Sequence, residues 1–340
     1  MQNETRKLFN AYRDEVANLN GVTDVSEKFT ATPSVQQRME NRMQESVEFL
    51  GMINNVGVDE QQGEKIGLGI GAPVSGTTNT ATTDRAVTDP TALDAEGYLC
   101  TQTNFDTYLS YSKLDMWAKF EDFQTRIRNM LLTRAALDAI MIGFNGTSRA
   151  ATSNKGANPM LQDVNIGWLE KIRQFAPERY MEEVAAASGT IEIGSSVAAA
   201  NGYKNIDALV HDMVNNLMEP WYREDTELVC VVGRKLISDK MFGIINVSQA
   251  PTEQLATKIL TSQVTVGALP AVRVPYFPEN GILVTRLDNL SRYYQNGKRR
   301  RTIVDNAKRD RVENYESSND AYVVEDYGLT AFAENIELVD

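Results

Sequence analysis

A long stretch with few apolar side chains constrains the fold of this chain more than any other feature. Residues 51–98 offer too little apolar surface for a packed core, and residues 77–83 are all threonine, asparagine or alanine. Gly67, Gly69 and Gly71 alternate with period two, which suits a flexible strand. A loop of this length inside a compact domain is uncommon unless it is functional. We therefore expect a two-stranded excursion that contacts another chain.

A long helix follows this excursion. The segment from Ser112 to Asp115 resembles a capping box, and apolar side chains then recur at steps of mainly three and four from Trp117 to Phe144. Gly143 and Gly146 give the stop signal. The pattern predicts a helix over residues 115–144, roughly 40 Å long at about 1.5 Å per residue. Beside a projecting hairpin, a helix of that length suits a structural strut.

The N-terminal segment reads as two helices joined by a linker. Apolar and aromatic residues from Phe9 to Leu19 recur at helical spacing, and Gly21 ends that pattern. Residues 22–33 are rich in threonine and serine and lack strong periodicity, so we expect an exposed linker that a protease can reach. A second helix is predicted over residues 34–50.

The remaining chain is an α/β section followed by strands. Residues 206–221 and 234–242 have helical patterns, and residues 228–232 form a continuous apolar run typical of a buried strand. Residues 185–202 are rich in alanine, serine and glycine and predict a surface loop. The last sixty residues alternate in hydropathy and predict strands.

Composition argues against most binding chemistry. Lys and Arg total 34 against 46 Asp and Glu, a formal net charge of -12, which disfavours a dedicated nucleic-acid binder. The chain has no run of about 18 apolar residues, so we expect no membrane contact. Its first residues lack the apolar core of a signal peptide, and we expect it to stay in the cytoplasm where it is made.

The residues that usually carry catalysis are scarce. His211 is the single histidine and lies in a helical pattern, while Cys100 and Cys230 lie in strand-like apolar contexts that predict buried thiols. We therefore expect no catalytic residue, metal or cofactor. A hydrolase or transferase using the acidic pairs at residues 121–122 and 224–225 remains an alternative, although neighbours on a helix point about 100° apart.

One basic run, residues 298–301, stands out against the acidic background. Charges of both signs follow it, including Arg309, Arg311 and Glu313. The run could contact nucleic acid, but this mixture favours pairing between subunits on the surface. The candidate contact residues are therefore Arg299, Arg300, Arg301, Arg309, Arg311 and Glu313. An arm, a projecting hairpin, a strut helix and a mixed-charge strand region together are typical of an assembly protein.

Short segments spread over nearly the whole chain resemble one family in order and spacing. None is decisive alone. The segments are Glu4–Arg6, Phe9–Tyr12, Met43–Ser46, Gly63–Gly67, Met141–Gly146, Asn158–Val164, Glu219–Tyr222, Leu269–Pro278, Asp310–Ser317 and Tyr322–Tyr327. In these segments the chain resembles the major capsid proteins of P2-like tailed phages (peduoviruses).

The resemblance implies an α+β fold of the Hong Kong 97-like capsid type. Its parts map onto the chain as an N-terminal arm, an extended β-hairpin loop, a peripheral domain with a long spine helix, and an axial α/β domain. The expected ranges are 1–55 for the arm, 56–104 for the loop, 105–200 for the peripheral domain with its spine at 115–144, 203–290 for the axial domain, 295–327 for strands returning to the peripheral domain, and 328–340 for a C-terminal strand.

The resemblance also implies a function and partners. We expect a structural protein, not an enzyme, that forms hexamers and pentamers of an icosahedral head, with a scaffold, a maturation protease and a portal protein as partners. Double-stranded DNA would be packaged by non-specific proximity, and a decoration protein is a further candidate partner. The expected location is the virion, with assembly in the host cytoplasm. An encapsulin-like nanocompartment subunit is the alternative.

Two residue-level expectations follow from the family. Maturation cleavage is expected at Thr30, Ala31 or Thr32, and removing residues 1–31 takes away four cations and five anions, so the net charge moves only from -12 to -11. Lys65 lies on the predicted loop, where we expect an exposed lysine making ordinary intersubunit ion pairs, not the Lys-Asn crosslink of some relatives.

Overall fold

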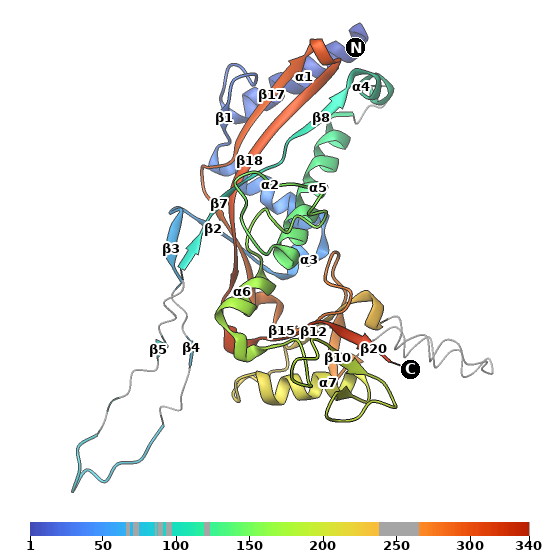
Figure 1. Cartoon of the computed structure of the whole chain (residues 1–340). Coiled ribbons are helices and arrows are strands. Elements are labelled where there is room, and N and C mark those ends of the chain that lie inside the picture. Colours follow the sequence, from blue (N-terminus) through green and yellow to red (C-terminus); the bar gives the residue numbers. More distant parts are fainter. Residues whose placement is uncertain are drawn as a thin grey trace, which may run out of the picture.

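Two sheets stacked along the long axis and one projecting hairpin define the architecture (Figure 1). The computed structural model describes residues 1–65, 69–70, 75–85, 87, 91–92, 97–118, 123–237 and 265–339. Both helices and strands contribute throughout, so the α+β expectation matches the observed elements. The division into arm, peripheral and axial domains stays a prediction. In the described part, no helix is long and apolar enough to cross a membrane.

The larger, seven-stranded sheet is organised around one long strand, β18 (Arg311–Val324). It pairs antiparallel with four other strands, and Asp310, in the left-handed conformation at φ 49°, helps turn the hairpin from its neighbour. The other strands are β1 (Phe29–Thr30), β2 (Asn54–Val58), β7 (Thr101–Asn104), β8 (Thr107–Ser110), β16 (Leu290–Gln295) and β17 (Arg300–Asn306).

Helices of the N-terminal half pack on this sheet (Figure 1). The predicted first helix is confirmed as α1 (Asn3–Asn20), which ends at Gly21 with φ 65°. The second is α2 (Pro33–Ser46), with proline in its first turn, followed by α3 (Glu48–Met52). The helix predicted over 115–144 is described as two elements, α4 (Tyr111–Trp117) and α5 (Phe123–Asn145), and residues 119–122 lie outside the described ones.

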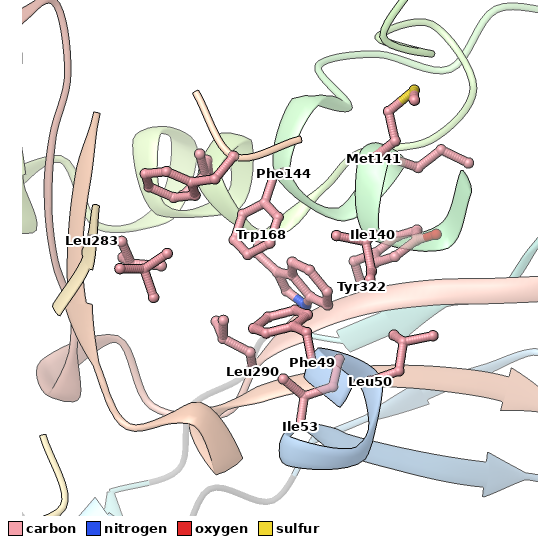
Figure 2. Packing of buried hydrophobic residues seen from close by; sticks show 14 of the residues in the cluster. Phe49, Leu50, Ile53, Ile140, Met141, Phe144, Trp168, Leu283, Leu290 and Tyr322 are labelled. Carbon is pink, nitrogen blue, oxygen red and sulfur yellow. The ribbon is translucent and has the colours of Figure 1, made fainter. Parts of the chain in front are cut away.

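A core of aromatic side chains joins the long helix to both sheets (Figure 2). Trp168, which opens α6 (Trp168–Phe175), is fully buried and contacts Phe144 and Tyr322 edge-on, with ring centroids 5.1 and 5.3 Å away. Its indole N–H donates to the carbonyl of Ser291 at 2.9 Å. Leu283 of the second sheet belongs to the same cluster, so a single core fixes both sheets.

The second sheet has six strands and its own apolar cluster. The strand predicted at 228–232 is confirmed as β12 (Val229–Val232) at its centre. The helix predicted at 206–221 ends earlier: it consists of α7 (Ile206–Asp212) and the π-helical η2 (Met213–Leu217). Most of the helix predicted at 234–242 lies outside the described residues. The other strands are β9 (Tyr180–Met181), β13 (Thr265–Val266), β14 (Leu269–Val272), β15 (Ile282–Thr285) and β19 (Ala331–Ala333).

A third sheet corrects the prediction of a surface loop at 185–202. That range contains β10 (Ile191–Ile193), which pairs parallel with β11 (Gly202–Tyr203) and β20 (Ile336–Leu338), and both isoleucines are buried. Tertiary burial of these two side chains overrides the polar local composition. Four single turns complete the elements, η1 (Pro177–Arg179), η3 (Leu287–Asn289), η4 (Ala307–Arg309) and η5 (Tyr327–Leu329).

The predicted excursion is present and points away from the two sheets (Figure 1). At its base β3 (Gln62–Glu64) pairs with β6 (Gly97–Leu99), and further out β4 (Gly69–Ile70) pairs with β5 (Thr91–Ala92). Residues 77–83 are exposed. The hairpin prediction is confirmed for these described strands.

Candidate assembly surfaces

A buried cluster of five charges ties α2 to the large sheet. Glu40 of α2 accepts hydrogen bonds from Arg292 at 2.6 Å and from Arg299 at 2.7 Å. Arg292 also donates to Asp320 at 2.8 Å, and Arg299 to Glu316 at 2.7 Å. Each of the five residues is at most 8% exposed. The cluster therefore anchors the segment that follows the predicted cleavage region to β16, to β18 and to Arg299, which directly precedes β17.

Electrostatic pairing outweighs the cost of burying these groups. Burial alone raises the pKa of Glu40, but the two guanidinium groups of Arg292 and Arg299 more than offset it, so the pKa lies below its ordinary value. Glu316 behaves in the same way, with Arg299 and Arg301 as the offsetting charges. The carboxylates thus stay ionised in the interior, and removing one partner would leave a buried charge unpaired.

Arg299 is buried and Arg301 is half-buried, so neither is the exposed surface residue that the sequence predicts. Arg299 is 2% exposed within the charge cluster. Arg301 donates to Asn314 at 2.7 Å and to the hydroxyl of Tyr12 in α1 at 2.8 Å. The run enters β17 at Arg300, and on either side of Arg300 the side chains of Arg299 and Arg301 turn inward, to Glu40 of α2 and to Tyr12 of α1. Their role in contacts between subunits stays a prediction.

Of the other charged candidates, Arg309, Arg311 and Glu313 lie toward the tip of the β17–β18 hairpin, whereas Arg300 begins β17 at the opposite end. Arg309 is exposed and Arg300 is half-buried, and neither makes an ion pair with another described residue. Arg311 pairs with Glu313 at 2.6 Å and lies 4.7 Å from the ring centroid of Tyr108. Arg300 and Arg309 are thus the candidates whose charge is free for a partner.

Lys65 is not exposed. Its side chain is buried at the base of the projecting hairpin, where Nζ donates to the carbonyl of Val324 at 2.6 Å and lies 4.5 Å from the ring centroid of Tyr327. The expectation of an exposed loop lysine is therefore wrong. The lysine fastens the hairpin to the point where β18 leaves the large sheet.

The predicted linker at residues 22–33, which contains the predicted cleavage region, is exposed at most of its positions, including Thr30, but it is held in a sheet and is not a free linker. Phe29 and Thr30 form β1, which pairs antiparallel with Arg301 and Arg300 of β17, and the amide of Ala31 donates to the carbonyl of Arg299 at 2.8 Å. Val25, Phe29 and Ala31 are at most 8% exposed. The threonine-rich composition did not reveal this packing, because the buried side chains are few and spaced apart in the sequence.

The arm packs through an apolar cluster of its own. Phe9, Val16 and Val25 contact Ile303 and Val312 of the β17–β18 hairpin in a group distinct from the two larger cores. Arg6 pairs with Asp305 at the rim of this cluster. Residues 1–31 are therefore held by a small, separate interface.

A groove of about 640 Å³ opens between α1, α2 and α5. Apolar side chains of all three helices line it, among them Leu19, Val35, Met39 and Leu132. Its rim carries the guanidinium groups of Arg38, Arg42 and Arg128.

Groups that could support catalysis are dispersed. No set of three or more His, Cys, Asp or Glu is placed to hold a metal ion within the part of the chain that the structure describes. His211 is exposed and contacts Asn215, and burial raises the pKa of the Cys100 thiol to about 12. Glu121 and Asp122 lie outside the described residues.

Comparisons with known proteins identify the class first. The chain superposes on a chain of the satellite phage P4 procapsid that includes the size determination (Sid) protein, with a TM-score of 0.83, 48% identity, and coverage of 100% of this chain and 99% of that one. The fold is thus that of a phage capsid protein. Residues 8–336 match the phage major capsid protein, P2 family, and the chain belongs to that family.

Two relatives agree with this assignment over their whole length. The chain is 51% identical over 345 residues to capsid proteins of Escherichia phage P2, covering 100% of this chain and 96% of the relative. It is 41% identical over 341 residues to the major capsid protein of Serratia phage KSP20, covering 99% of this chain and 97% of the relative. The resemblance and the α+β capsid fold of the Hong Kong 97-like type are confirmed. The chain is a major capsid protein of a phage head, a subunit of a multimeric shell, and the encapsulin alternative is not favoured.

Proposed function

We propose that this chain builds hexamers and pentamers of an icosahedral head that encloses double-stranded DNA, and that assembly is directed by a scaffold. The membership in a capsid family over residues 8–336 supports the proposal. A portal protein would occupy one vertex, and DNA would lie near the shell without specific contacts, in keeping with the net charge of -12. Arg300 and Arg309 are the proposed subunit contacts with free charge.

Proteolytic maturation at Thr30, Ala31 or Thr32 is the second part of the proposal. The arm before this region is held by its own small apolar cluster, whereas α2 after it is anchored by the buried charges around Glu40. Cutting between them would free residues 1–31 and leave the rest of the fold attached. Because β1 is paired in a sheet, the protease must act on a locally opened arm.

Electron microscopy of the purified chain, expressed with and without its scaffold and protease, tests this function. We expect closed shells with both present, and capsomers or irregular assemblies without the scaffold. Closed shells around cargo without any scaffold would favour the encapsulin-like alternative. A monomer under both conditions at high concentration would contradict assembly as the function.

Mass spectrometry of the shell subunit tests the cleavage. We expect the mature N-terminus to lie between Thr30 and Pro33, with no change in the C-terminal half. A mature subunit that begins at Met1 or Gln2 would contradict the proposal.

A further inference from the structure

The groove between α1, α2 and α5 offers an apolar surface flanked by helices. Its volume, about 640 Å³, falls within the roughly 300–1,000 Å³ of ligand-sized clefts. Val35 and Met39 lie one helical turn apart on α2, and Leu19 of α1, which is 44% exposed, faces the same space. An apolar floor between two helices is the surface that the apolar stripe of a third helix covers.

The rim of the groove is cationic in a chain that is acidic overall. Arg38 and Arg128 are exposed and make no ion pair with any other described residue. Arg42 pairs only with Glu45, and both side chains are more than 60% exposed, so that pair contributes little. Of the two acidic residues that line the groove, Glu316 is engaged by Arg299, which leaves Glu15. Three cations therefore face one free carboxylate.

We propose that this groove binds an acidic amphipathic helix of the scaffold. Apolar residues at helical spacing would enter between Leu19, Val35 and Met39, and carboxylates on both flanks would meet Arg38 and Arg128. The proposal rests on the scaffold-directed assembly proposed above and specifies where the capsid chain receives the scaffold.

The same geometry couples scaffold binding to maturation. One wall of the groove is α1, which precedes the predicted cleavage region, and its floor continues into Phe29 and Ala31 at that region. Losing residues 1–31 would remove that wall and leave α2 and α5 without it. The scaffold helix would lose its apolar contacts when the arm leaves, so cleavage of the capsid chain would also release the scaffold.

A binding assay on the full chain tests the charge complementarity. The probe is a stapled helical peptide of about 18 residues, since shorter or free helices are marginal in water. It carries leucines along one face and glutamates on both flanks, and its matched control carries lysines in place of the glutamates. We expect the acidic peptide to bind and the basic peptide not to bind. Binding should weaken with salt.

Charge reversal locates the site. The R38E/R128E variant should bind the acidic peptide about tenfold more weakly or worse. R38K/R128K should retain binding, and K113E/K155E, at two exposed lysines that do not line the groove, should bind like the original chain. Unchanged melting temperatures would show that all three variants fold. Equal binding of the two peptides, or tenfold loss in K113E/K155E, would overturn the proposal.

Photo-crosslinking separates the scaffold from other occupants. A crosslinking residue at Met39, in the groove, should capture the co-expressed scaffold in procapsids, whereas one at Met116, exposed on α4, should not. Capture of a second capsid chain, or binding of a short DNA duplex that R38E/R128E abolishes, would overturn the proposal. If R38E/R128E still builds scaffolded shells in normal yield, the groove proposal fails while the proposed function stands. If the original chain builds no shells, the function itself fails.

Discussion

At the scale of single residues, the basic run at residues 298–301 shows that composition does not predict which charged side chains are buried. Arg299 and Arg301 turn inward to Glu316 and Tyr12, while Arg300 between them makes no ion pair with another described residue. The alternation of a strand separates neighbours onto opposite faces, and that period could have been applied to this run before the structure was known. The sequence could not predict that Glu40 is the partner of Arg299, because Glu40 lies about 250 residues away on α2.

Replacing Glu40 tests the buried charge cluster. E40Q keeps the shape but leaves Arg292 and Arg299 without their shared carboxylate, so we expect a loss of about 3–5 kcal/mol in the free energy of unfolding. Urea unfolding of the unassembled chain measures it. The matched variant E45Q, at an exposed glutamate on the same helix, should change the free energy by less than about 0.5 kcal/mol. A similar small loss in both variants would contradict the account.

The same cluster makes stability depend on acid pH. The pKa values of Glu40 and Glu316 lie below the ordinary 4.5, so the unfolded chain takes up protons before the folded one does. The stabilisation is fully present above about pH 4.5 and is lost as the pH falls through the lower, folded values. Unfolding free energies measured from pH 7 to pH 3 should drop less steeply in E40Q than in the original chain. Equal slopes would show that these carboxylates do not carry the effect.

At the scale of elements, the sequence predicted helix and strand positions correctly where a turn residue or a periodic apolar face determines them. Gly21 ends α1 as predicted. The capping box at residues 112–115 predicted the wrong first residue for the next helix. This helix, α4, begins at Tyr111, and the side chain of the preceding Ser110 makes no cap hydrogen bond. The linker prediction missed one feature, the pairing of β1 with β17, a strand some 270 residues later.

Loosening the arm should leave α2 in place. Phe9 is 3% exposed within the arm cluster, and F9A removes a buried ring from this cluster, which contains no residue of α2. Hydrogen exchange should accelerate over residues 3–31, while α2, held by Glu40, keeps its protection. The matched variant L8A, at an exposed position of the same helix, should change neither. Equal loss of protection in both helices of F9A would contradict separate anchoring.

Lys65 should govern the base of the projecting hairpin. K65M keeps the aliphatic stem but loses the hydrogen bond to Val324 and the contact with Tyr327, at a cost of about 1–3 kcal/mol. Hydrogen exchange at β3 and β6 should rise with little change in β12. K155M, at an exposed lysine, is the control. Unchanged exchange in K65M would show that the strand pairing alone holds the hairpin.

At the scale of the whole molecule, the relation between the two sheets depends on how closely α5 and α6 approach. A Cβ on Gly143 would lie 2.2 Å from the indole of Trp168, and one on Gly167 would lie 2.4 Å from the carbonyl oxygen of Gly143. The sequence suggested that Gly143 helps to stop the helix. Its position inside α5 shows that it is instead needed for the approach of Trp168, which only the folded core reveals.

Gly143→Ala therefore tests the junction of the two sheets. Alanine favours a helix interior by roughly 0.8–1.0 kcal/mol, but forcing a methyl group into the Trp168 ring costs typically 1–3 kcal/mol, so the net change should be destabilising. Because Trp168 joins the core of both sheets, the strain should also alter their relative angle and yield irregular shells by electron microscopy. Gly76→Ala, on the projecting loop with no atom within 4 Å, should melt and assemble normally. Regular shells and an unchanged melting temperature for Gly143→Ala would show that the core adapts without moving the sheets.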